Sequence, residues 1–527
     1  MRKKLLYLFS LIILVILFST RAADAQGYVK FSTYLGGSSY DSVVISVVDN
    51  GNTYILANTT SANYPVTNGS TYKGGWDNVV TKYDPNGNVV YSTYIGGSGD
   101  DFLNQMQVVN GEVFLSGTTN SPNYPVTNGS TYGAGIGNPT DIVVTKLNTS
   151  GNISFAGYFG GNGDDELGFV SPMQIVNNEL YISGSTFSPN FPIINGTPAD
   201  PAASGDAFIF ALKTTDCSTI FSTCVGGTGY DDAEVMQVDS ISGQVYISGQ
   251  TQSPDLPVTN GSIFSGAVDI LVASYSSTGT KNLVTYLGGS NDDDITTNIN
   301  IVNGSIYITG TTASSNFPVT DGSINTQASY SVAFIAKLTS NGHISFAKYI
   351  GDQVTGYDDP LESQFINNNI YILNMNYDGG SNFDSSYSDI IKLDTAGNII
   401  YSTKLQGTFY TPPNNIYASG YFTSDMKIIN GEVYLNGVMN GGGYPVTNGS
   451  TYYPAGTGYF TKLGTGGNII FSEYLGEMNN VSPIRVANNR LYMLGTIIGA
   501  TYPVTNGSSF SGGEDNIVFA FNTDGST

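Results

Sequence analysis

The chain has 527 residues, a formal net charge of −23, one histidine and two cysteines. An acidic surface repels nucleic acid and anionic membranes, and one histidine excludes a histidine-based zinc site and the usual serine–histidine–aspartate triad. The 65 glycines and 37 tyrosines indicate turns and strands rather than helices. Cys217 and Cys224 stand in a predicted turn and in the strand after it, too far apart along the chain to pair. We therefore expect a large buried core, and no disulfide, to stabilise the fold.

The N-terminus has the pattern of a secretory signal peptide. Basic residues at Arg2–Lys4 precede the apolar run Leu5–Phe18, and residues 23–25 form a cleavage sequence of small residues. The apolar run is short for a membrane span, which needs about 20 residues. We expect cleavage after residue 25 and export of residues 26–527 as a secreted or cell-surface protein with no membrane span. The alternative is an uncleaved N-terminal anchor.

One phrase of the type Phe-Ser-Thr-Tyr-Leu-Gly-Gly recurs at intervals of about 63 residues, so the chain is a repeat protein. Each unit carries four strand signals, named A to D. Strand A is the phrase, strands B and C form a hairpin around Asn-Gly or Asn-Asn, and strand D follows a long segment that usually contains Pro-Val-Thr-Asn-Gly-Ser. The eight phrases begin at Phe31, Tyr91, Phe155, Phe221, Leu283, Phe346, Tyr401 and Phe471.

The elements of one unit, in chain order, show how we expect the strands to pair. Strand A is Val89–Ile95, the B–C hairpin turns at Asn110-Gly111, and strand D is Ile142–Leu147. Asn-Gly favours a type I′ turn, because both of its central residues need positive φ. The short D–A and B–C turns predict an antiparallel D-A-B-C meander, and the long C–D segment is expected to cross to the next meander.

Eight such meanders predict an all-β fold, a single eight-bladed β-propeller that is expected to be monomeric. Its ring would close by pairing of the C-terminal strand Asn516–Phe521 with the N-terminal strand Val29–Leu35. Seven blades are the alternative number. A β-solenoid fits poorly because its rungs are shorter, and separate β domains fit poorly because one blade cannot bury both of its faces.

Four linked motifs resemble the SBBP β-propeller repeat family, which occurs on bacterial surface and secreted proteins. They are Tyr34–Gly37 followed by Asp41, the hairpin Gly51–Ile55, the Phe/Tyr-Pro-x-Thr stretch, and the strand Asp141–Lys146. The resemblance covers essentially all of the mature chain. It implies a surface or secreted scaffold and no defined catalytic set, and the family's name suggests seven blades.

The A–B loops combine glycines with paired carboxylates. Residues 96–103 and 160–167 match the nonapeptide of RTX calcium rolls, and Ca²⁺ prefers oxygen ligands. The competing interpretation, which we favour because the copies are not in tandem, is that the glycines form a tight turn and the aspartates cap backbone N–H groups. Asp41, Asp101, Asp165 and Asp232 are assigned to the repeat position, which indicates a structural role. The candidate calcium ligands are Asp100, Asp101, Asp164, Asp165, Asp231, Asp232, Asp292 and Asp293.

Units six and seven depart from the repeat, and catalytic or binding residues are expected at such departures. Unit six lacks the Pro-Val-Thr motif, and unit seven has an enlarged A–B loop. Their tyrosines, phenylalanines and aspartates suit stacking and hydrogen bonding to a sugar or a peptide, whereas the alternative is a loop that packs its aromatics on the rim. The candidate ligand-binding residues are Tyr377, Asp378, Phe409, Tyr410, Tyr417 and Tyr421. No residue is assigned a catalytic role.

Three further features have structural interpretations. His343 is expected to be an exposed turn residue, Trp76 to pack beside a D strand, and the Asn-Gly-Ser triplets to form turns rather than glycosylation sites. The sequence therefore favours a non-catalytic exported scaffold that binds a protein or a glycan. The alternatives are a glycosidase or lyase with its site on units six and seven, and a structural surface or matrix component.

Overall fold

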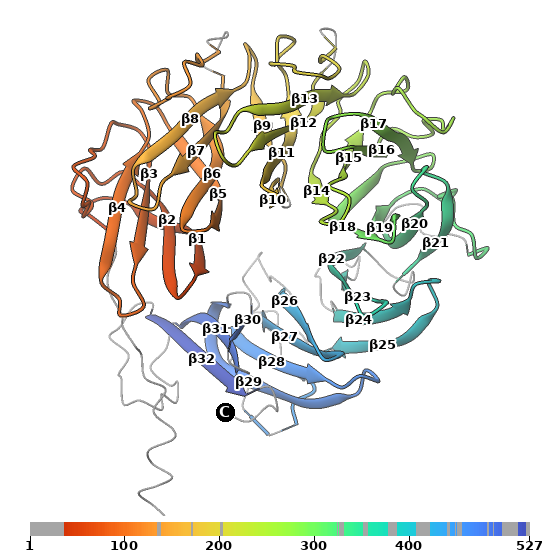
Figure 1. The fold of residues 1–527 in the computed structure, drawn as a ribbon. Helices are drawn as coiled ribbons and strands as arrows, with labels where there is room; N and C mark the ends of the chain where they lie inside the picture. The colour runs from red at the N-terminus through yellow and green to blue at the C-terminus, as the bar shows by residue number, and fades with distance from the viewer. Residues whose placement is uncertain are drawn as a thin grey trace, which may run out of the picture.

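The computed structural model describes residues 36–133, 139–169, 172–200, 204–323, 325, 331–350, 357–377, 387–406, 422–439, 443–447, 449–450, 456–481, 484–487, 490–497 and 515–522. The regular elements in these ranges are β-strands, which form a ring of sheets around a common centre (Figure 1). This arrangement confirms the all-β propeller. Within the same ranges, no helix is long and apolar enough to cross a membrane.

The strands follow the repeat unit by unit. The first four sheets contain β1 (Asp41–Asp49), β2 (Asn52–Thr59), β3 (Asp77–Tyr83), β4 (Val89–Ile95), β5 (Asp101–Val109), β6 (Glu112–Thr119), β7 (Asp141–Leu147), β8 (Ile153–Phe159), β9 (Asp165–Leu167), β10 (Met173–Val176), β11 (Glu179–Thr186), β12 (Asp206–Lys213), β13 (Thr219–Val225), β14 (Val235–Val238), β15 (Val245–Thr251), β16 (Asp269–Tyr275) and β17 (Lys281–Leu287). The later sheets contain β18 (Asp293–Val302), β19 (Ser305–Thr312), β20 (Val332–Leu338), β21 (Ile344–Tyr349), β22 (Tyr357–Ile366), β23 (Asn369–Tyr377), β24 (Tyr387–Asp394), β25 (Ile399–Gln406), β26 (Phe422–Ile429), β27 (Glu432–Met439), β28 (Thr457–Leu463), β29 (Ile469–Val481), β30 (Arg485–Ala487), β31 (Arg490–Ile497) and β32 (Asp515–Asn522).

The first six sheets run from the centre of the ring outward in the order B, C, D, A, as β1-β2-β3-β4 does in the first sheet. The predicted D-A-B-C meander is therefore wrong. The long C–D segment joins two strands of the same sheet, since β2 pairs with β3, and the A–B loop crosses to the next sheet.

The physical reason is that the long segment covers the outer edge of its own sheet. The Thr67 N–H donates to the Ser92 carbonyl (3.0 Å), and the Ser92 N–H donates to Thr67 Oγ1 (2.9 Å). Asn68 Oδ1 accepts hydrogen bonds from the N–H and the hydroxyl of Ser70, which confirms the turn interpretation of the triplet. The Pro-Val-Thr-Asn-Gly-Ser segment thus protects the outermost strand β4, which would otherwise be an open edge.

Several local predictions are confirmed. Asn110 and Gly111 have φ values of 54° and 78°, as a type I′ turn requires. Cys217 and Cys224 are both free and buried. His343 is exposed in the turn between β20 and β21.

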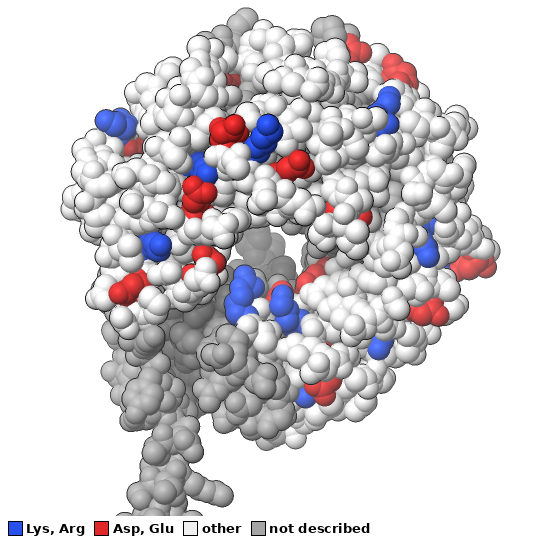
Figure 2. All heavy atoms as spheres, viewed as in Figure 1, with Lys and Arg blue, Asp and Glu red and all other residues white. Residues whose placement is uncertain are grey.

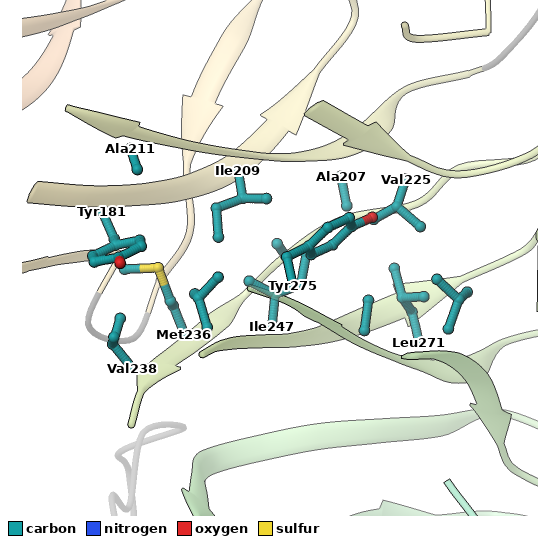
Figure 3. Close-up of a cluster of buried hydrophobic side chains, with 14 of the residues drawn as sticks. Tyr181, Ala207, Ile209, Ala211, Val225, Met236, Val238, Ile247, Leu271 and Tyr275 are labelled. Carbon is teal, nitrogen blue, oxygen red and sulfur yellow. The ribbon is translucent and has the colours of Figure 1, made fainter. Parts of the chain in front are cut away.

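Neighbouring sheets bury their faces against each other. Figure 3 shows one such interface, in which Tyr181 and Ile209 of the third unit meet Met236, Ile247 and Tyr275 of the fourth. Side-chain amides also join the innermost strands of different units. The Gln107 side chain, for example, donates to the Met173 carbonyl (2.9 Å) and accepts from the Ile175 N–H (3.0 Å). Contacts of this kind hold the sheets in a ring, since no sheet is stable alone.

The eighth unit is joined to the seventh through the long strand β29. This strand pairs with β28 along its first part and with β31 near its end, and β32 pairs with β31. The predicted strand Asn516–Phe521 is therefore present within β32. Its predicted partner, Val29–Leu35, lies outside the described residues, so ring closure and the number of blades stay predictions.

Candidate functional site

The ring has two faces with different chemistry. The turn face carries the B–C and D–A turns. The loop face is the opposite end of the strands, where strand A ends, strand B begins, strand C ends and strand D begins. Charged side chains are sparse, and in the view of Figure 2 basic and acidic residues are interspersed around the ring.

On the turn face, two units of the described chain pair a lysine with a glutamate. Lys146 Nζ lies 2.9 Å from Glu112 Oε2 and 5.2 Å from the centre of the Phe114 ring. Lys462 repeats this arrangement with Glu432 and Tyr434. A carboxylate and an aromatic ring together hold one ammonium group in each case.

On the loop face, the repeated aspartate is a structural residue. Asp101 is fully buried, and its Oδ2 accepts hydrogen bonds from the Gly97 N–H (2.6 Å) and the Ser121 hydroxyl (3.0 Å). Its Oδ1 accepts a hydrogen bond from the Thr119 hydroxyl. These contacts are the ones that the capping interpretation predicts. The same serine and glycine contacts recur at Asp41, Asp165, Asp231 and Asp293.

A second repeated aspartate explains the glycine of the loop. Asp77, the first residue of β3, is fully buried, and its Oδ2 accepts the Lys73 N–H (2.7 Å). A Cβ on Gly96 would clash with Asp77 Oδ1 and would lie 2.9 Å from Asp101 Oδ2, so a side chain has no room there. Burial raises the pKa of Asp77 to about 7, and the Asp101 charge adds to the effect. The equivalent pairs of aspartate and glycine are Asp141 with Gly160, Asp206 with Gly226, and Asp269 with Gly288.

The candidate calcium ligands include the buried repeated aspartates and the aspartates that directly precede them. Asp100 Oδ1 accepts the Trp76 N–H (3.1 Å), Asp164 Oδ1 accepts the Thr140 N–H (2.9 Å), and Asp292 is exposed. In the part of the chain that the structure describes, no group of three His, Cys, Asp or Glu side chains could hold a metal ion. Calcium binding therefore stays a prediction that a direct experiment must test.

The structure corrects the assignment of one repeat position. Asp231, and not Asp232, occupies the place of Asp101, because Asp231 accepts the Gly227 N–H (2.9 Å) and the Ser253 hydroxyl (2.6 Å). Two adjacent aspartates are indistinguishable by sequence alone. Asp232 thus departs from the repeat and is available for another role.

Asp232 belongs to a group of three carboxyls at the start of the innermost strands β14 and β18 (Figure 1). Its oxygens accept hydrogen bonds from the Gln250 N–H (2.7 Å) and the Tyr230 hydroxyl (3.1 Å). The Gln250 side chain donates to Asp294 Oδ2 (3.0 Å), and Glu234 hydrogen bonds to Asp232.

Burial and mutual repulsion disfavour the charged forms of these carboxyls. Burial, with the Asp232 and Asp294 charges, raises the pKa of Glu234 to about 8. Burial raises the pKa of Asp232 to about 6, and the Asp294 charge contributes.

Aromatic rings lie beside this group. Phe187 and Tyr230 stack with their ring centres 6.0 Å apart, although 42% of Phe187 is exposed. Glu166 is close enough to raise the pKa of Tyr230, after the larger effects of burial and Asp232. Phe169, which is 82% exposed, follows a glycine whose backbone lies against the carbonyl oxygens of residues 233 and 234. We call this surface the acidic–aromatic patch, and it comprises Glu166, Phe169, Phe187, Tyr230, Asp232, Glu234 and Asp294.

The sequence reasoning missed this patch, although a signal for it exists. The position directly after the repeated aspartate is Ser42 in unit one and Phe102 in unit two, but it is acidic in units three to six. Elsewhere on the loop face, Trp76 packs on Phe102 with ring centres 6.0 Å apart, as its packing interpretation predicts.

The ligand site predicted on units six and seven lies largely outside the described residues. Tyr377 is the last residue of β23. Asp378, Phe409, Tyr410, Tyr417 and Tyr421 fall in ranges that the structure does not describe. That site therefore stays a prediction.

Comparison with known proteins supports no family assignment. No family model and no curated protein sequence matches the chain. Among solved structures, a europium-containing methanol dehydrogenase is 9% identical with a TM-score of 0.43, and the match covers 93% of each chain. The β-propeller domain of the Trilobed protease from Pyrococcus furiosus is 7% identical with a TM-score of 0.33, over 77% of this chain and 91% of that domain. A quinohemoprotein alcohol dehydrogenase from Pseudomonas putida HK5 is 9% identical with a TM-score of 0.41, over 88% of this chain and 72% of that one. These likenesses concern the fold and carry no conclusion about activity.

Proposed function

We propose that the chain is an exported, non-catalytic β-propeller scaffold that binds an extracellular protein or glycan through its loop face. One observation supports this most directly. In the carboxylates that recur with the repeat, such as Asp101, both oxygens accept hydrogen bonds from residues of the ring itself. On the loop face, side chains that differ between units, such as the exposed Phe169 and Phe187, are left to meet a partner.

The leader sequence and the motifs that resemble the SBBP repeat family agree with this proposal. A signal peptide directs a chain out of the cytoplasm. The resemblance implies a surface or secreted scaffold without a catalytic set. Membership of that family and a monomeric state are part of the proposal.

One pair of neighbouring carboxyls, Asp232 and Glu234, does not have the spacing of a glycosidase pair. Asp232 and Glu234 hydrogen bond to each other, whereas the two carboxyls of a glycosidase stand about 5 Å or more apart to hold the sugar between them. A carbohydrate-active enzyme stays an alternative that depends on units six and seven.

The test is a binding screen of the purified mature chain, residues 26–527. The immobilised protein is presented with a glycan array and with secreted and surface proteins of the source cell. We expect saturable binding with a Kd in or below the micromolar range. The absence of any such binding would contradict the scaffold proposal and favour a purely structural role. Release of reducing ends or unsaturated products from polysaccharides would establish the enzyme alternative instead.

A further inference from the structure

We infer that the acidic–aromatic patch binds a basic segment of a protein partner, with lysine or arginine side chains seated among its carboxyls and rings. This inference rests on the proposed binding function and narrows the partner to one chemistry.

Among the described residues, no lysine or arginine forms an ion pair with the carboxyls of the patch. Asp232, Glu234 and Asp294 lie within one hydrogen-bonded group that also contains Gln250. Within the described residues, the two ion pairs are both on the turn face, and neither reaches this group. A cation that enters the patch would relieve the repulsion among the three carboxyls.

The turn face of the same chain shows how such a group holds a cation. There, Glu112 and the Phe114 ring hold the ammonium group of Lys146 between them. The patch offers the same two components, a carboxylate and an aromatic ring, at Asp232 and Tyr230, but it contains no lysine. The missing component is the one that a partner would supply.

A metal ion fits the patch less well than an ammonium or guanidinium group. Calcium prefers six to eight oxygen ligands, and among the described residues no group of three His, Cys, Asp or Glu side chains is placed to hold a metal ion. Exposed rings such as Phe187 attract organic cations and offer no ligand to calcium.

The extent of the patch favours a peptide segment over a single small cation. Glu166 and Phe187 belong to the third unit, Asp232 and Glu234 to the fourth, and Asp294 to the fifth. A segment with several basic residues can contact all three units at once. A neutral glycan would stack on the rings but would leave the repulsion among the carboxyls unrelieved.

The experiment measures the Kd of the mature chain for a fluorescein-labelled lysine-rich peptide by fluorescence anisotropy. The matched peptide has glutamine in place of each lysine. The patch variant is D232N/E234Q/D294N, which removes the three ionisable carboxyls while keeping hydrogen-bonding side chains. We expect the patch variant to bind the lysine-rich peptide at least about tenfold more weakly, and the glutamine peptide not to bind.

The matched control removes three charges from other parts of the surface. The variant D84N/D321N/D394N is suitable because other units carry asparagine at these places. Asn148 caps its turn as Asp84 does, and Asn68 binds the serine of its triplet as Asp321 does. We expect this variant to bind within about twofold of the unchanged chain.

A variant of an aromatic residue measures how much the rings, apart from the carboxyls, contribute to affinity. F187L keeps the carboxyls and removes one face for cation–π contact, and we expect about a threefold loss of affinity. The Tm of each variant checks folding. The patch variant should melt no lower than the unchanged chain, because it loses repulsion.

The outcomes separate this inference from the proposed function. Equal weakening by the patch and control variants would show attraction by net charge alone and overturn the inference. Binding of a glycan or a protein that the patch variant leaves unchanged would also overturn it, while the scaffold proposal would stand. A chain that binds neither the peptide nor any extracellular partner would contradict both.

Discussion

On the turn face, Lys146 meets a glutamate and a phenylalanine of its own unit, whereas on the loop face Asp232 and Glu234 meet a ring without a lysine. The residue types are similar, but the turn-face contacts repeat from unit to unit and the patch does not. Contacts that recur in a repeat protein hold the units together. The difference between the two faces indicates that function is to be sought where carboxyls depart from the repeat and have no lysine or arginine of the described residues paired with them.

The same contrast exists between two adjacent residues. Asp231 is fully buried and holds its loop through the Gly227 N–H and the Ser253 hydroxyl, whereas Asp232 faces two other carboxyls. Substitutions can separate the aspartates that stabilise the fold from those that depart from the repeat.

The largest effect is expected from removal of the repeated aspartate. In D231A, the Ser253 hydroxyl and the Gly227 N–H lose their acceptor inside the protein, so we expect a loss of about 3 kcal/mol in the free energy of unfolding. Urea denaturation measures it. The neighbouring variant D232N keeps its acceptor for Gln250 and should change the free energy by less than about 1 kcal/mol. An equal loss in the free energy of unfolding in D231A and D232N would contradict the assignment of a structural role to Asp231 alone.

A somewhat smaller effect is expected at a glycine of the turn face. Gly151 has φ of 80°, and a Cβ there would overlap the ring of Tyr91, which lies in the preceding sheet. We expect G151A to lower the free energy of unfolding by about 2–3 kcal/mol. The control G129A has φ of 75° but no atom within 4 Å of the new Cβ, so it should lose only about 1 kcal/mol. Thermal melts of the two variants show whether the contact between units matters.

The pH dependence of stability should differ between the faces. Burial raises the pKa of Asp77, Asp165 and Asp206 to about 7 from 3.8, so the folded state keeps protons that the unfolded state releases. Their contribution to stability is present below about pH 4 and is lost as the pH rises to about 7. On the turn face, hydrogen bonds lower the pKa of Asp84 and Asp394, and their contribution is lost as the pH falls below about 4.

We therefore expect the Tm to be highest near pH 4–5 and to fall toward pH 8. The variant D77N should show a smaller fall over this range, because its side chain does not titrate. A Tm that rises from pH 5 to pH 8 would contradict the assignment of raised pKa values to the loop face.

The smallest effect is expected from chelation of calcium. The oxygens of Asp101 already accept three hydrogen bonds, so the loop does not need an ion to hold its shape. We expect the same Tm with calcium and with a chelator. A clear drop on chelation would establish the calcium interpretation of the A–B loops instead.

Much of the fold could be predicted from the sequence, because it depends on local rules. The hairpin at Asn110-Gly111 needs positive φ at both residues, and the strand Val89–Ile95 was predicted with the bounds that β4 has. Local rules did not predict which strands share a sheet. The length of a connection does not say whether it crosses to the next sheet or folds back along the outer strand, as Thr67 does on Ser92.

The candidate site was predictable only in part. The sequence pointed to the Gly-Gly-Asp loops and to departures from the repeat, but it could not tell Asp231 from Asp232. Glu166 and Asp294 are more than a hundred residues apart, and they share a surface only because the innermost strands of successive units converge around one axis (Figure 1). The sequence by itself determined the repeat, the strands and the turns, because each follows from neighbouring residues. Only the tertiary structure decided which carboxyls accept hydrogen bonds that hold the loops and which lie beside carboxyls of another unit. The physical reason is that burial and repulsion depend on the side chains of the neighbouring blade.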